Sequence, residues 1–140
     1  MSEMTKQRPG TMRLVDATKY RLPLAALVSI LHRASGLLIF VLLPFLLWLF
    51  DNSLSSEATY SRFTSAFIAG IGVVPAWCVK LVVWVLIWAF LHHLMAGLRH
   101  LWLDATHRVS KDQGRHTAVV TLALSLLLTL VFGAKLFGLF

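Results

Sequence analysis

Three long apolar blocks, separated by short polar connectors, constrain this chain more than any other feature. They cover residues 22–50, 63–98 and 117–140. A helix needs roughly 20 apolar residues to cross a hydrocarbon core about 30 Å thick. Because lipid offers the backbone no hydrogen-bond partners, each block is expected to be helical. The sequence therefore predicts an all-α membrane protein with three transmembrane helices, at about residues 26–50, 66–98 and 117–139.

The composition agrees with a membrane protein and argues against a soluble one. Hydrophobic residues make up 58% of the 140 residues and charged residues only 14%, whereas soluble domains carry about 25% charged residues. No internal repeat or low-complexity tract divides the chain, so we expect residues 1–140 to form a single membrane-anchor domain. The one cysteine, Cys78, excludes an internal disulfide and a multi-cysteine metal site.

The net charge of +7 is unevenly distributed and predicts an orientation. Residues 1–33 and 99–116 are rich in lysine and arginine, whereas residues 51–62 hold one basic side chain, Arg62. Basic loops stay in the cytoplasm, so we expect a short cytoplasmic N-terminal segment, a cytoplasmic second connector and a C-terminus on the other side. His107 and His116 are expected to be exposed in that second connector. Topology thus explains the charge without a nucleic-acid partner.

The first apolar block contains polar side chains that are costly inside a membrane. An arginine such as Arg33 near the middle of a span costs about 2.5–3.5 kcal/mol on insertion scales, and such residues are usually functional. Ser29 and Arg33 share one helix face, which Gly36 continues. This face is suited to bind a quinone carbonyl or a propionate. The alternative is that Arg33 extends to the membrane surface and has no ligand.

The second apolar block ends in a group of histidines. His93, Gly97 and His100 are spaced so that they share one helix face, and neutral imidazole is a common axial ligand of haem iron. His92 and His93 point in different directions, so at most one of them can bind a given iron. A second axial histidine is then expected from another chain. The alternative is that these histidines lie at the membrane surface or form hydrogen bonds between helices.

Two motifs in these blocks carry a family resemblance. The first combines residues 6–9 (Lys-Gln-Arg-Pro) with residues 29–36 (Ser-Ile-Leu-His-Arg-Ala-Ser-Gly), and the second comprises His93, Gly97, Arg99, His100 and Asp104. Together they resemble the signatures of the cytochrome b membrane-anchor subunits of succinate dehydrogenase. The chain departs from the pattern at Leu103, where this family usually has an aromatic residue or methionine.

The resemblance implies a haem b that is shared with a second three-helix anchor subunit. By this resemblance His93 is the axial ligand of the haem. The positions that match residues near the haem propionates are His32, Arg33 and His100.

The resemblance also implies a site for ubiquinone, the substrate that this family reduces. The matching positions are Ser29, Ile30 and Arg33. An iron–sulfur subunit and the second anchor would complete this site, and a flavoprotein subunit would oxidise succinate to fumarate. The chain itself would carry no succinate chemistry, and the complex would lie in the bacterial inner membrane. Two alternatives are the anchor of a quinol:fumarate reductase and a non-catalytic membrane scaffold with three spans.

Overall fold

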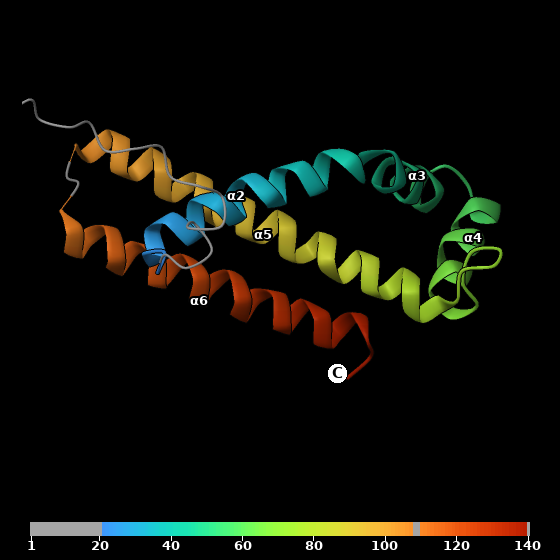
Figure 1. Cartoon of the computed structure of the whole chain (residues 1–140). Helices are drawn as coiled ribbons and strands as arrows, with labels where there is room; N and C mark the ends of the chain where they lie inside the picture. The colour runs from blue at the N-terminus through green and yellow to red at the C-terminus, as the bar shows by residue number, and fades with distance from the viewer. Residues whose placement is uncertain (1–20, 108–109, 140) are drawn as a thin grey trace, which may run out of the picture.

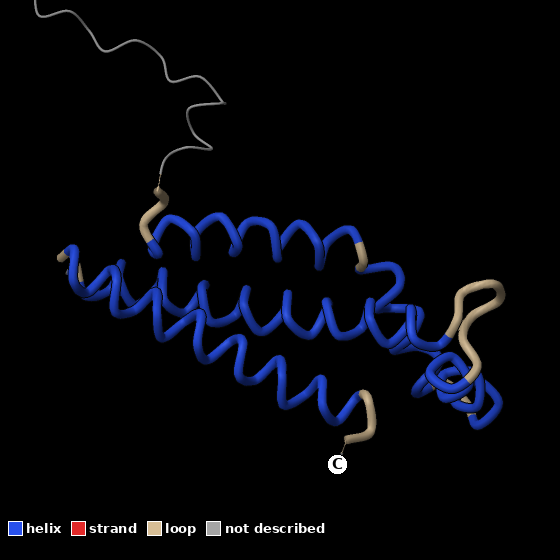
Figure 2. Tube along the Cα trace, turned by 60° about the horizontal axis from the view of Figure 1, so that its bottom comes forward, coloured by secondary structure: helices blue, strands red, loops and turns tan. Residues whose placement is uncertain are grey.

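The structure, a computed structural model, describes residues 21–107 and 110–139, and this part of the chain contains helices and no strand (Figures 1 and 2). The helices are α2 (Leu24–Val41), α3 (Leu43–Leu54), α4 (Glu57–Ile68), α5 (Ala76–Thr106) and α6 (Lys111–Leu136). Three of them, α2, α5 and α6, are long and apolar enough to cross a membrane. The prediction of an all-α protein with three spans is confirmed. The expected N-terminal segment and the motif at residues 6–9 lie outside the described residues.

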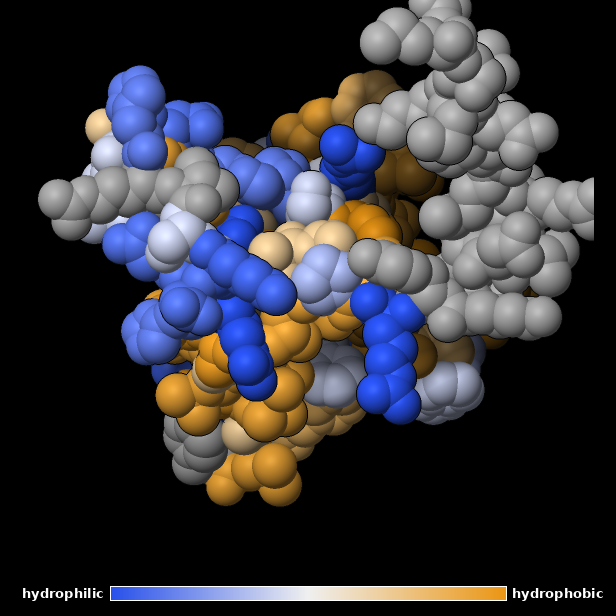
Figure 3. All heavy atoms as spheres, turned by 60° about the vertical axis from the view of Figure 1, so that its left-hand side comes forward, coloured by the Kyte–Doolittle hydropathy of each residue, from blue (hydrophilic) through white to orange (hydrophobic). Residues whose placement is uncertain are grey.

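Helix α5 lies at the centre of the bundle, between α2 and α6. Figure 1 shows α2 and α6 running in one direction along it and α5 running in the other. The starts of α2 and α6 therefore lie beside the end of α5, and we call this end of the molecule the basic end. Hydrophilic side chains gather there, whereas apolar side chains dominate behind them (Figure 3). The charged side chains described at this end include Arg21, Arg99, Lys111 and Arg115.

The first span is shorter than expected because the helix is interrupted. The sequence predicts one helix over residues 26–50, but α2 ends at Val41 and α3 begins at Leu43. The break falls at Leu42, which has φ −90° and ψ 4°. Pro44 follows in the first turn of α3. A proline cannot donate to a carbonyl four residues earlier and its ring clashes with that carbonyl, so the helix restarts here.

The second span begins later and ends later than expected. The predicted start at residue 66 is wrong, because residues 57–68 form the separate helix α4, which lies across the end of α3 and the start of α5 (Figures 1 and 2). Ser56 begins α4 with a capping box that includes Thr59. Pro75 precedes the first residue of α5, which continues to Thr106 instead of ending at residue 98. The second connector is correspondingly short.

Small and hydroxyl-bearing side chains form the contact between α5 and α6. On α6 they are buried and recur every four residues, at Thr121, Ser125, Thr129 and Gly133. On α5 the buried small residues are Ala89 and Ala96. Such residues allow membrane helices to approach closely. The Trp84 indole crosses this contact and donates from Nε1 to the Thr129 carbonyl at 3.2 Å. Large apolar side chains instead lie mostly on the outside, as expected in lipid.

Candidate functional site

Three histidines from two spans meet toward the basic end, and we call them the imidazole cluster. His32 of α2 stacks on His93 of α5 with ring centroids 4.2 Å apart and planes inclined by 22°. His100 of α5 lies on the same side of that helix, 5.3 Å from the His32 ring. Gly97 also faces His32, since a Cβ atom there would lie 3.6 Å from His32 Nε2. The predicted common face of His93, Gly97 and His100 is therefore confirmed.

Hydrogen bonds from α2 fix the orientation of the His93 ring. Its Nδ1 lies 3.1 Å from the His32 carbonyl oxygen and 3.5 Å from Ser35 Oγ. A carbonyl oxygen can only accept, so the proton of the neutral ring is on Nδ1 and the lone pair is on Nε2. Within residues 21–107 and 110–139, His93 Nε2 has no hydrogen-bond partner. Unlike the Nε2 atoms of His32 and His92, it is not buried. A haem-ligating histidine needs this arrangement, in which the second nitrogen donates to a carbonyl.

The neighbouring His92 points into the contact between α5 and α6. The His92 ring is completely buried, lies 5.6 Å from the Trp88 ring and has Nδ1 3.2 Å from Ser125 Oγ. Its Nε2 is buried without a hydrogen-bond partner in the described part of the chain. The two adjacent histidines therefore face different helices, as their spacing predicts. A ring enclosed in this way leaves no space beside it for a porphyrin.

The residues expected at the quinone site lie on the outside of α2. Ser29 is half-buried, whereas Ile30 and Arg33 are exposed. The described residues provide neither a side-chain hydrogen bond to Ser29 nor an ion pair to Arg33. Gly36 was expected to continue their face, but the atoms nearest to a Cβ at this position all belong to His93. This chain therefore brings the histidines together and leaves Ile30 and Arg33 facing outward, with Ser29 half-buried beside them.

Sequence reasoning did not anticipate the buried position of Arg99. The charge pattern places Arg99 in the second connector, yet its side chain is only 8% exposed and bridges α5 to α6. Its Nε donates to Thr117 Oγ1 at 3.1 Å and its Nη2 donates to the Gly114 carbonyl at 3.2 Å. The signal was present in the sequence, because hydroxyl residues recur every four positions from Thr117 along the third block. His107 and His116 are exposed, as predicted.

The donor set at the imidazole cluster fits a haem better than a bare metal ion. The described residues contain no group of three or more histidine, cysteine, aspartate or glutamate side chains that could hold a metal ion. A haem that is shared between two chains needs one nitrogen from each. His93 Nε2 meets this need, and Gly36 and Gly97 add no side-chain bulk beside the cluster.

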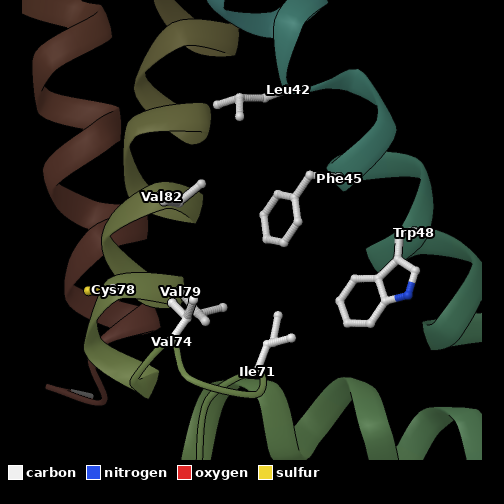
Figure 4. Close-up of a pocket in the computed structure, with 8 residues that line it drawn as sticks. All are labelled: Leu42, Phe45, Trp48, Ile71, Val74, Cys78, Val79 and Val82. Atoms are coloured by element: carbon white, nitrogen blue, oxygen red, sulfur yellow. The ribbon is translucent and has the colours of Figure 1, made fainter.

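An apolar pocket lies at the opposite end of the bundle, far along α5 from the histidines. It encloses about 450 Å³ between α3, α5 and the turn that follows α4 (Figure 4). The lining side chains are all apolar or weakly polar: Leu42, Phe45, Trp48, Ile71, Val74, Cys78, Val79 and Val82. None of them can hold a charged or strongly polar group, so the pocket is not a second polar site.

Comparison with known proteins agrees with the geometry. A family model described as "Succinate dehydrogenase/Fumarate reductase transmembrane subunit" matches residues 4–132. A relative from Coxiella burnetii, named succinate dehydrogenase cytochrome b556 subunit, is 30% identical over 130 residues, which cover 93% of this chain and 97% of the relative. A protein of the same name from Paracoccus denitrificans is 30% identical over 112 residues, covering 80% of this chain and 81% of that protein.

Proposed function

Because the chain belongs to the succinate dehydrogenase/fumarate reductase transmembrane subunit family, we propose that it binds haem b and helps to form a quinone-reduction site. It would do so as an anchor subunit of a succinate dehydrogenase. Both relatives carry the name cytochrome b556 subunit of that enzyme. The observation that carries the proposal is the hydrogen bond that orients His93 and leaves its Nε2 lone pair available for a ligand.

His93 is the proposed axial ligand of the haem. A second three-helix anchor would supply the other axial histidine, because His32 stacks on the side of the His93 ring and His100 lies beside His32. The His32 ring lies 4.2 Å from the His93 ring and 5.3 Å from the His100 ring. We assign them, with Arg33, to the haem propionates, which are anionic and accept hydrogen bonds. Haem b would supply reversible one-electron storage.

Ser29, Ile30 and Arg33 are the proposed quinone-binding residues. The exposure of Ile30 and Arg33 on α2, beside the half-buried Ser29, supports a site that is completed by other subunits. An arginine on a lipid-facing surface within a span is costly, so a polar surface from a partner is expected to cover it. The guanidinium would stabilise negative charge on a quinone oxygen, and its effect is larger in a dry site than in water. The Ser29 hydroxyl would donate a hydrogen bond to a quinone oxygen.

The remaining chemistry would belong to other subunits. A flavoprotein subunit would oxidise succinate, and an iron–sulfur subunit would pass the electrons to ubiquinone at the membrane edge. The basic end, where the imidazole cluster lies, would face the cytoplasm according to the distribution of lysine and arginine. The N-terminus would then be cytoplasmic and the C-terminus periplasmic, in a bacterial inner membrane.

A fumarate reductase anchor is the second candidate, because the description of the family model includes that enzyme. The cytochrome b556 relatives favour succinate dehydrogenase. The test is a reduced-minus-oxidised spectrum of the complex purified through this chain, together with its flavin content and its rates in both directions. Haem bands, bound flavin and faster succinate oxidation support the proposal. A preparation with neither haem nor flavin would leave only a membrane scaffold.

A further inference from the structure

We propose that Ser35 is a positioning residue for His93, and that the missing side chain of Gly36 creates the space in which the His93 ring stands. The inference rests on the proposed role of His93 as a haem ligand. It concerns two neighbouring positions on α2 that face α5.

Ser35 is completely buried and lies between two polar groups. Its Oγ donates to the His32 carbonyl at 2.9 Å and lies 3.5 Å from His93 Nδ1. A hydroxyl has a single proton, which is used in the bond to the carbonyl. The oxygen of Ser35 can therefore only accept from the Nδ1–H of His93.

This second acceptor matters because the His32 carbonyl receives more donors than it has lone pairs. In an α-helix it accepts from the amide of Gly36, four residues later. It also accepts from Ser35 Oγ and lies 3.1 Å from His93 Nδ1. A carbonyl oxygen has two lone pairs. The Nδ1–H of His93 is therefore shared between the carbonyl and the Ser35 oxygen, and both oxygens determine the direction of the ring.

Gly36 limits the ring from another side. A Cβ at this position would lie 2.8 Å from His93 Cε1 and 3.1 Å from Nδ1. The His32 ring, stacked at 4.2 Å, also contacts the His93 ring. The imidazole is thus held between a neighbouring ring, two oxygens and a backbone without a side chain. Any larger residue at position 36 must displace His93.

These contacts predict an electronic effect on a bound haem. An acceptor on Nδ1–H makes Nε2 a stronger electron donor to iron, and a stronger donor stabilises the ferric state. Removal of the Ser35 hydroxyl takes away one acceptor of the His93 Nδ1–H and also removes a competing donor from the His32 carbonyl. It should therefore move the haem midpoint potential away from the wild-type value. Ser35 would act through His93 and would not contact the haem iron or the quinone.

The test uses Ser35→Ala in the assembled complex, with a redox titration of the haem and the low-spin EPR spectrum of its oxidised form. We expect the haem to be retained, and both its midpoint potential and its EPR g values to shift from the wild-type values. Ser35→Thr, which keeps a hydroxyl, should return both signals toward the wild type. Ser125→Ala is the matched control, because it removes a buried hydroxyl 3.2 Å from the other histidine, His92. It should leave both signals unchanged.

A second pair of variants decides the matter if Ser35→Ala does not assemble. Gly36→Ala should lower the haem content per flavin, whereas Gly114→Ala, with open space around its Cβ, should not. An unchanged potential and EPR spectrum in Ser35→Ala, an equal shift in Ser125→Ala, or full haem content in Gly36→Ala would overturn the inference. A wild-type complex without haem would overturn the proposed function itself.

Discussion

The imidazole of His93 lies against that of His32, with ring centroids 4.2 Å apart, although 61 positions separate the two residues in the chain. The contact joins the first and second spans at one depth. It also separates the roles of two adjacent histidines, because His92 faces the third span instead. The two can therefore be distinguished by substitution.

His93→Leu is expected to remove the haem b absorption bands from the assembled complex. Leucine cannot ligate iron, and the Nε2 lone pair of His93 is the donor that this chain offers. The matched variant His92→Leu should retain the bands, because His92 bonds to Ser125 in the interior. Optical spectra normalised to flavin content check both results. Bands that survive in His93→Leu and vanish in His92→Leu would reverse the ligand assignment.

Arg33→Ala is expected to lower ubiquinone reduction by about 10²-fold, the usual effect of removing a group that stabilises developing charge. Ser29→Ala should act in the same direction. Succinate oxidation with a soluble artificial acceptor should be unaffected, since that reaction bypasses the membrane site. Arg115→Ala, which removes an exposed cation of α6 at the same end of the bundle, serves as the control. Equal quinone turnover in Arg33→Ala and Arg115→Ala would contradict the site.

Thr117→Val is expected to destabilise the contact between α5 and α6 by about 1 kcal/mol, a typical value for a hydrogen bond between membrane helices. The substitution removes the hydroxyl that accepts from the buried Arg99. Thr106→Val is the control, because the Thr106 hydroxyl donates within its own helix, to the Trp102 carbonyl. Thermal denaturation of the detergent-solubilised complex measures the difference. The interpretation fails if both valine variants unfold at the same temperature.

Gly133→Ala is expected to separate α5 from α6 near the end away from the histidines. A Cβ at this position would collide with the Trp84 indole, which would lose its hydrogen bond to the Thr129 carbonyl. Overpacking of this kind costs about 1–3 kcal/mol. Gly114→Ala, on the same helix but with open space around its Cβ, should have a much smaller effect. The same thermal assay checks it.

The number of spans and the face shared by His93, Gly97 and His100 could be predicted from the sequence. Both depend on local rules, namely the length of an apolar block and the periodicity of a helix. The apolar block at residues 22–50 predicts one continuous helix, and its length and hydrophobicity do not reveal the interruption at Leu42 that precedes Pro44. The apolar pattern does not predict the separate helix α4, because it divides α4 between the connector at 51–62 and the block at 63–98, although Ser56 and Thr59 form a capping box.

The burial of Arg99 could not be derived from counting charges. An arginine near the end of a span normally extends to the membrane surface. Here its partners are a hydroxyl and a carbonyl of α6, which are 18 and 15 residues away in the chain. In the proposed quinone site the surroundings of Arg33 would come from other subunits, and the sequence of this chain alone does not specify them.

The rotational setting of α5 about its own axis follows from the bonds that Trp84, His92 and Arg99 make to α6. His93 lies on the same helix, so the direction in which its side chain points is set by these contacts on the opposite side of α5. One residue inserted between Trp84 and His92 would turn the histidine-bearing half by about 100°. It would then force a choice between keeping the bonds of Trp84 and keeping those of His92 and Arg99. The angular alignment of the imidazole with α2 is therefore encoded in the third span as much as in the first.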